Sequence, residues 1–255
     1  MDEVLTTADS GILHITINRP EQRNALNLHV LTGLHSAIRQ AGSDRAVRVV
    51  TITGSGNKAF CAGADLKSTL AGSDAAFKLS DYRELLLEIL RCPKPTVALA
   101  NGHVLAGGLG LLLSCDLALA CDDIHFSTPE IQVGMFPMMV LSLLYRHVGR
   151  KRATEMLFLG ERISAAAAME YGIINHIYPR ERFDVEANLY VRKLADQSAS
   201  ILRLGKDAIF QVEGKSLPAE LEYLESMLAK VTSSADSKEG LRAFVEKRKP
   251  QWTDE

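Results

Sequence analysis

The sequence predicts an α/β fold with a helical region at its C-terminal end. Up to about residue 180, short β-branched or apolar runs alternate with amphipathic helical patterns, which is typical of stacked ββα units. From there on the pattern is almost entirely helical, and no flexible linker separates the two parts. We therefore expect an α/β core over residues 1–195 and a C-terminal helical region over residues 196–255. The helical region should pack on the core or on a neighbouring subunit.

The elements follow from side-chain periodicity. Residues 11–18 alternate in polarity and residues 47–53, VRVVTIT, form a β-branched run, so both predict strands. Between them, residues 28–41 carry apolar side chains at three- and four-residue steps and predict a helix. The further strands expected in the core cover residues 97–100, 117–120, 124–127 and 173–177. The further core helices expected cover residues 64–69, 75–90, 109–113, 136–148, 151–159 and 164–171. The last four helices are expected over residues 183–196, 200–212, 217–230 and 238–247.

Composition excludes several classes of protein. The 255 residues are 47% hydrophobic and 24% charged, as in ordinary globular proteins. A net charge of −2 and a pI of about 6.4 argue against a dedicated nucleic-acid binder, which is usually basic. Asp116 and Arg146 interrupt the apolar runs, so no transmembrane helix is expected, and the acidic N-terminus lacks a signal-peptide pattern. Neither nucleic acid nor a membrane is therefore expected as a partner.

The cysteines bear on the cellular location. Cys61, Cys92, Cys115 and Cys121 lack the Cys-x-x-Cys spacing of a zinc site, so no metal site is expected. They are better interpreted as reduced thiols of a cytosolic protein, and we expect a cytoplasmic location.

The segment over residues 97–121, VALANGHVLAGGLGLLLSCDLALAC, is the most unusual in the chain. A short strand runs into the turn dipeptide Asn101-Gly102, and Ala106-Gly107-Gly108 then opens an apolar helix. Small residues let a ligand approach the backbone, and the free N–H groups of a helix start favour negative charge. The alternative is a tight turn whose glycines serve packing alone.

A second segment, KAFCAGADLK at residues 58–67, makes the pattern specific. Together with NGHVLAGGLG it resembles the crotonase superfamily, the enoyl-CoA hydratase/isomerase family. The resemblance covers nearly the whole chain and includes RPEQRNALN at 19–27, TPEIQVG at 128–134, LFLGERISAAAAMEYGIINHI at 157–177 and FVEKRKPQW at 244–252. Each motif is weak alone. In family order they are specific to the superfamily, though not to one of its reactions.

The resemblance implies a crotonase-like spiral of ββα units with a C-terminal helical oligomerisation region. The expected substrate is an acyl-CoA thioester, in which coenzyme A is part of the substrate and no separate cofactor is needed. The expected assembly is a homotrimer or a dimer of trimers.

The family's motifs also assign candidate site residues. The backbone N–H groups of Ala64 and Gly107 would bind the oxygen of a thioester enolate, which explains why small residues stand there. Glu130 would be the acid/base carboxylate, although Ser127 and Glu130 also fit a helix capping box. The residues expected to bind the substrate are Arg23, Ala62, Asp65, Leu66, Lys67, Phe244 and Lys247. The alternative for Phe244 and Lys247 is a solvated basic helix end.

This chain departs from the hydratases of the family in two places. Those enzymes carry a second glutamate three residues after the oxyanion glycine, where this chain has Gly110. They also have small residues after the position of Pro137, whereas this chain has Met138-Met139-Val140-Leu141, whose methionines could line an acyl pocket or face the core.

Three functions remain open at this point. The favoured one is an enoyl-CoA isomerase with Glu130 as its single base. The second is an enoyl-CoA hydratase whose second acid/base group lies elsewhere in the chain. The third is a CoA- or RNA-binding protein without catalysis, which Gly110 and the basic clusters at residues 150–152 and 247–249 would support.

Overall fold

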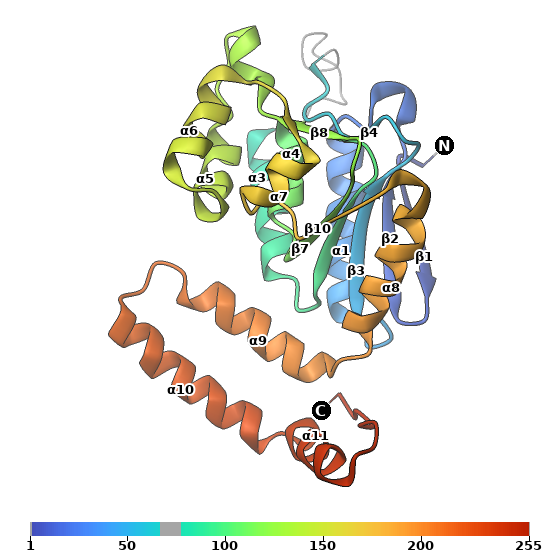
Figure 1. Cartoon of the computed structure of the whole chain (residues 1–255), viewed down its shortest axis with the longest axis vertical. Coiled ribbons are helices and arrows are strands. Elements are labelled where there is room, and N and C mark those ends of the chain that lie inside the picture. Colours follow the sequence, from blue (N-terminus) through green and yellow to red (C-terminus); the bar gives the residue numbers. More distant parts are fainter. Residues whose placement is uncertain (1, 67–77, 255) are drawn as a thin grey trace.

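The computed structural model describes residues 2–66 and 78–254 (Figure 1). The strands are β1 (Val4–Asp9), β2 (Ile12–Ile17), β3 (Val49–Gly54), β4 (Ala59–Cys61), β5 (Thr96–Ala100), β6 (His103–Leu105), β7 (Leu117–Cys121), β8 (His125–Ser127), β9 (Ile163–Ser164) and β10 (His176–Tyr178). The helices are α1 (Leu28–Ser43), α3 (Leu79–Arg91), α4 (Gly107–Leu113), α5 (Met138–His147), α6 (Arg150–Leu159), α7 (Ala165–Glu170), α8 (Phe183–Ala195), α9 (Ala199–Val212), α10 (Leu217–Ser233) and α11 (Ala235–Glu246). Short 3₁₀ turns are η1 (Pro20–Gln22), η2 (Pro129–Val133) and η3 (Arg180–Arg182).

The strands form two sheets, between which the chain alternates. The large sheet has the order β1-β2-β3-β5-β7-β10, and the small sheet has the order β4-β6-β8-β9. Each step from β3 to β4, from β5 to β6 and from β7 to β8 carries the chain from the large sheet to the small one. This alternation is the stacked ββα arrangement that the sequence predicts.

Strand direction is parallel through most of both sheets. From β2 to β10 every pair in the large sheet is parallel, and Thr51 of β3 lies between His14 of β2 and Val97 of β5. In the small sheet β4, β6 and β8 are parallel to one another. Of the strands in the described residues, only the edge strands β1 and β9 pair antiparallel with their neighbours. The carboxyl ends of β4, β6 and β8 therefore meet at one edge.

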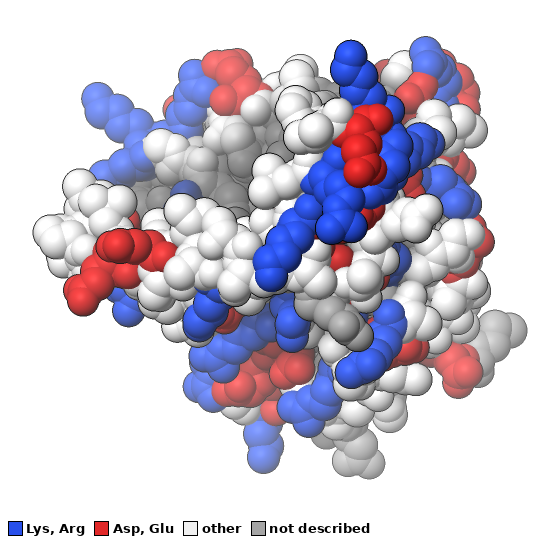
Figure 2. All heavy atoms as spheres, turned by 90° about the horizontal axis from the view of Figure 1, so that it is seen from below, with Lys and Arg blue, Asp and Glu red and all other residues white. Residues whose placement is uncertain are grey.

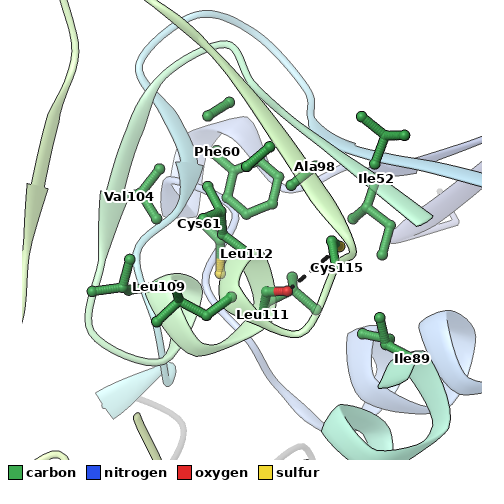
Figure 3. Packing of buried hydrophobic residues seen from close by; sticks show 14 of the residues in the cluster. Ile52, Phe60, Cys61, Ile89, Ala98, Val104, Leu109, Leu111, Leu112 and Cys115 are labelled. Atoms are coloured by element: carbon green, nitrogen blue, oxygen red, sulfur yellow. Dashed lines mark hydrogen bonds between the residues drawn. The ribbon is translucent and has the colours of Figure 1, made fainter. Parts of the chain in front are cut away.

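The core lies between the sheets and the helices that cover them. α4 is apolar around its whole circumference and is almost entirely buried, as such a helix must be. Figure 3 shows Phe60 and Cys61 of β4 packed beside Leu109 and Leu112 of α4. This packing fixes α4 against the small sheet. All four cysteines are free and buried.

Some elements differ from the sequence-based expectation. β1 is absent from it, because Val4–Asp9 is a polar, largely exposed edge strand whose sequence lacks a buried face. β6 lies between the expected turn at Asn101-Gly102 and the start of α4, and β10 begins at His176, the first residue that pairs with β7. The expected helix over 64–69 and the start of the one over 75–90 fall largely outside the described residues.

The C-terminal helices form a separate layer. α8 packs on β2, β3 and β7 of the large sheet. Figure 1 shows α9 and α10 running antiparallel below the core, with α11 at the lower end of the molecule. The expected division after residue 195 falls at the end of α8 and stays a prediction. Within residues 2–66 and 78–254, every helix is too short or too polar to cross a bilayer.

Candidate active site

Three loops meet where the parallel strands of the small sheet end. Ala64, Gly107 and Glu130 each lie two or three residues beyond the carboxyl end of β4, β6 or β8. They line one cavity of about 600 Å³. The fold therefore brings together the three residues that the motifs assign to chemistry, although they are far apart in the sequence.

The loop that carries Ala64 is held open toward this cavity by its pairing with Leu26. The Leu26 N–H donates to the Gly63 carbonyl at 2.7 Å, and the Asp65 N–H donates to the Leu26 carbonyl at 2.8 Å. Successive peptide groups of an extended chain point to opposite sides, so the Ala64 N–H points away from Leu26. That direction is available for a ligand.

Gly63 lets this loop approach the start of α4. Its φ is +84°, and a Cβ placed on it would lie 2.6 Å from Ala106 Cβ and 2.9 Å from Gly107 N. Any residue with a side chain would push the Ala64 and Gly107 backbones apart. The motif CAGAD therefore needs a glycine at this place for steric reasons.

Gly107 begins α4, and its N–H belongs to the first turn, which has no partner within the helix. The preceding residue, Ala106, has φ 52° and ψ −129°, a backbone conformation that L residues rarely adopt. Behind the turn, a Cβ on Gly108 would lie 2.2 Å from the Cys61 carbonyl oxygen. Close packing on β4 thus sets the position of the Gly107 N–H.

Glu130 lies on η2 and does not form the capping box that its sequence permits. The Ser127 hydroxyl donates to the Gly160 carbonyl at 2.8 Å, and the 3₁₀ turn has no side-chain cap. The Thr128 hydroxyl donates to the Met156 carbonyl at 2.8 Å. These two bonds fix the turn against the end of α6 and leave the Glu130 side chain for the cavity.

The environment of Glu130 suits proton transfer. Burial raises the pKa of its carboxyl, and a hydrogen bond from its own backbone N–H opposes this only in part. Its Oε2 atom is buried and has no hydrogen-bond partner among the described residues. A carboxylate in this state is a better base than an exposed glutamate and has a lone pair available for a ligand proton.

The rest of the cavity is mostly apolar. Ala62 and Leu66 line one side, and Met138, Met139 and Val140 line another, together with neighbouring residues of the same segment. The methionines thus face the cavity. An apolar wall of this kind fits an acyl chain.

Two other residues that were predicted to bind the substrate do not line this cavity. Asp65 forms an ion pair with Arg19 at 2.9 Å and does not line the cavity. Arg23 lines a different, basic cleft of about 550 Å³ with Lys58 and Arg180 among others. Lys67 lies outside the described residues. Within one chain the structure brings neither Asp65 nor Arg23 into the cavity that holds Glu130.

Phe244 and Lys247 are even more distant from that cavity. Both belong to the end of α11, which Figure 1 shows at the opposite end of the molecule from β4 and β8. The Phe244 side chain is 84% exposed. Within one chain the structure brings neither Phe244 nor Lys247 into the cavity that holds Glu130.

Tyr82 is a cavity residue that sequence reasoning misses. It lies on α3, it is 4% exposed, and its hydroxyl donates to the Gly107 carbonyl at 2.5 Å. Burial, reinforced by the nearby Cys61 and Glu130, raises its pKa well above that of an ordinary tyrosine. Its helical spacing with Leu85, Leu86 and Ile89 is that of any core residue, so no sequence signal separates it from them.

Known proteins are similar to this chain over nearly its whole length. The sequence pattern of the enoyl-CoA hydratase/isomerase family matches residues 7–255. A Xenopus laevis protein named enoyl-CoA hydratase domain-containing protein 3, mitochondrial, is 36% identical over 96% of this chain and 84% of its own length.

Solved structures agree with the sequence comparisons. The human enoyl-CoA hydratase domain-containing protein 3 superposes with a TM-score of 0.92 at 30% identity, covering 98% of this chain and 100% of that one. An enoyl-CoA hydratase from Bacillus anthracis also gives a TM-score of 0.92, at 32% identity, covering 99% of this chain and 100% of that one. The crotonase-like spiral expected from the motifs is thereby confirmed.

Proposed function

The chain belongs to the enoyl-CoA hydratase/isomerase family, and from this premise we propose that it moves the double bond of an enoyl-CoA thioester. The proposal is based on which of the side chains lining the cavity carry a carboxyl group. Of the described residues that line it, only Glu130 has a carboxyl group. Moving a double bond needs one base, whereas adding water needs a group that activates water and usually a second one that positions it.

The thioester oxygen would bind between the N–H groups of Ala64 and Gly107. Developing negative charge on that oxygen is then stabilised by two donors, each contributing roughly 3–4 kcal/mol by analogy with other oxyanion holes. Coenzyme A enters as part of this substrate and not as a separate cofactor.

Glu130 would transfer the proton. Its carboxylate removes a proton from C2 of a 3-enoyl-CoA, and the electron pair delocalises over the dienolate. The protonated carboxyl then returns the proton to C4, and the double bond ends between C2 and C3. Because both carbons lie on one face of a planar intermediate, one carboxyl group can reach them both.

The direct test compares Glu130→Gln with the parent protein on a panel of 2-enoyl- and 3-enoyl-CoA esters. We expect double-bond movement to fall by about 10²–10⁴-fold, the usual loss for an acid/base group, with little change in CoA-ester affinity. Glu161→Gln, which changes an exposed glutamate outside the cavity, is the matched control. Full activity of Glu130→Gln would contradict the assignment.

Hydration is the second candidate, because the relatives that match are named as hydratases or hydratase domain-containing proteins. The same panel separates the two reactions. Rapid water addition to 2-enoyl-CoA without double-bond movement in 3-enoyl-CoA would support the hydratase and exclude the isomerase.

A binding protein without catalysis has weaker support. Arg152 of one basic cluster pairs with Glu170 at 2.7 Å, and Arg248 of the other pairs with Glu239 at 2.6 Å. These pairs reduce the positive charge that RNA would meet. Turnover of any enoyl-CoA would exclude this function, and salt-dependent retention of RNA would favour it.

The cytoplasmic location also stays a prediction, since the Xenopus relative is named as a mitochondrial protein.

A further inference from the structure

Tyr82 occupies the space next to Gly110 on the cavity side of α4. A Cβ placed on Gly110 would lie 2.2 Å from Tyr82 Oη and 3.3 Å from Val140 Cγ2. A Cβ on Gly107 would lie 3.5 Å from the same hydroxyl oxygen. Positions three residues apart share one face of a helix, so the tyrosine covers the face that would carry a side chain from position 110.

The hydroxyl of Tyr82 has a defined bond in this place. It donates to the Gly107 carbonyl at 2.5 Å, which links α3 to the first residue of α4. Burial keeps the pKa of the phenol high, so the group retains its proton at neutral pH. A protonated phenol that donates to the backbone is a poor base for activating water.

We propose that Tyr82 is the specificity-determining residue of the site, because its phenol hydroxyl occupies the space beside position 110, where the hydratases that this chain resembles carry a second glutamate. The inference rests on the proposed function and deepens it. With this volume filled by the phenol, Glu130 is the one carboxylate among the described residues that line the cavity, and they supply no second carboxylate of the kind that hydration usually uses. The pair Tyr82 and Gly110 thus favours movement of a proton along the acyl chain over addition of water.

The main experiment rebuilds the missing carboxylate. In Gly110→Glu/Tyr82→Ala, removal of the phenol leaves room for the new glutamate in the space that Tyr82 occupies in the parent protein. Water should then add to 2-butenoyl-CoA, with its oxygen bonding to C3 and a proton bonding to C2. We expect hydration at least about 10²-fold faster than in the parent protein, measured as 3-hydroxybutyryl-CoA by chromatography.

Two further variants serve as controls for the expected gain in hydration rate. Gly110→Gln/Tyr82→Ala places a side chain of equal size without a carboxylate, and it should show no gain in hydration. Gly110→Glu with Tyr82 retained should show none either, because Cβ would collide with the hydroxyl oxygen. A folded double variant that binds butyryl-CoA and gains no hydration would overturn the proposal.

A melting experiment tests the proposal even if the glutamate variants fail to fold. Gly110→Ala should lower the melting temperature in the parent protein and lower it much less in the Tyr82→Ala background, because the collision partner is gone. Equal effects in both backgrounds would overturn the proposal. So would a loss of hydration in Tyr82→Phe, since the hydroxyl would then itself be the second acid/base group.

The readouts distinguish this inference from the proposed function. Exchange of the C2 protons of butyryl-CoA in D₂O reports on Glu130 and the oxyanion donors without any double-bond movement or hydration. A parent protein that exchanges these protons but does not isomerise 3-enoyl-CoA would refute the isomerase. It would leave the prediction for Gly110→Glu/Tyr82→Ala to be decided by its own hydration rate.

Discussion

Glu130 is held in its position at some cost to the stability of the folded state. Burial raises the pKa of its carboxyl above the ordinary value of 4.5. The folded protein therefore binds this proton more tightly than the unfolded chain does. The favourable contribution is fully present below pH 4.5 and is lost as the pH rises through the folded-state value. At neutral pH the molecule carries a buried carboxylate that its fold would be more stable without.

The raised pKa of Glu130 leads to a stability prediction for Glu130→Gln. The amide does not ionise, so the variant should melt at a higher temperature than the parent protein at pH 7–8. The difference should shrink toward zero near pH 4, where Glu130 is protonated in both folded and unfolded chains. Differential scanning calorimetry across this range tests it. A variant that melts lower than the parent at pH 8 would contradict the burial argument.

Gly63 provides a second test at the scale of single residues. Gly63→Ala should destabilise the fold by about 2–4 kcal/mol, since a positive φ and a close contact both oppose the new Cβ. It should also slow C2 proton exchange, because the Ala64 and Gly107 backbones would move apart.

Gly214→Ala is the matched control for Gly63→Ala. Gly214 has a similar φ of +78°, but a Cβ placed on it would have no atom within 4 Å. Gly214→Ala should lower the free energy of unfolding, measured in urea, by about 1–2 kcal/mol, which is the cost of the backbone conformation alone. Equal losses at both sites would mean that the contact between the two loops is unimportant.

At the scale of elements, much of the fold can be predicted from the sequence, and some parts cannot. The run at residues 47–53 predicts β3 because β-branched residues fill a buried strand, and α1 follows from apolar spacing. β1 and β6 escape prediction, since pairing with a neighbouring strand forms them more than their own residues do. Tyr82 escapes for a related reason: helical spacing predicts that it is buried but not that it borders a cavity.

The attachment of α9 to the core rests on a buried cation. Lys206 is 8% exposed, and its Nζ donates to the Asp116 carboxylate at 2.7 Å and to the Lys94 carbonyl at 3.0 Å. Asp116 also accepts a hydrogen bond from the Thr96 hydroxyl at 2.8 Å. Asp116 therefore joins α9 to β5, as a structural residue.

Removal of this cation should loosen the helical layer. Lys206→Met leaves Asp116 without its charge partner and should cost about 2–4 kcal/mol, somewhat less than a fully buried pair because Asp116 is partly exposed. Hydrogen exchange should accelerate in α9 and α10 and stay unchanged in α1. Lys215→Met, which changes an exposed lysine beyond α9, is the control. Uniform acceleration across all helices would argue against a local attachment.

At the scale of the whole molecule, the C-terminal layer exposes several large apolar side chains. The large apolar side chains that are more than half exposed on α9, α10 and α11 are Ile209, Leu217, Leu221, Leu228, Leu241, Phe244 and Val245. Figure 2 shows Lys and Arg side chains gathered on the lower face of the molecule, on the side where Figure 1 places α11. Apolar patches beside charged ones are typical of protein interfaces.

We therefore predict that the protein forms a homo-oligomer built on threefold contacts, a trimer or a dimer of trimers. Light scattering at micromolar concentration should give a mass well above the 27.9 kDa of one chain. In such an assembly the α11 of one subunit can approach the cavity of the next, where Phe244 would stack on the adenine and Lys247 would pair with a phosphate of coenzyme A. This arrangement would reconcile their distance from Glu130 in one chain with their place in a family motif.

The double variant Phe244→Ala/Lys247→Ala tests both parts of this prediction together. It should weaken butyryl-CoA binding by about 10-fold or more in calorimetry, since a ring contact and a phosphate contact are lost together. Lys238→Ala, which removes an exposed basic side chain from the same helix and leaves its apolar side chains in place, is the matched control. Mixing the double variant with Glu130→Gln separates the roles, because a hybrid assembly would pair intact cavities with intact tails and recover part of the activity. A stable monomer with unchanged affinity in Phe244→Ala/Lys247→Ala would refute the assembly and the tail contact at once.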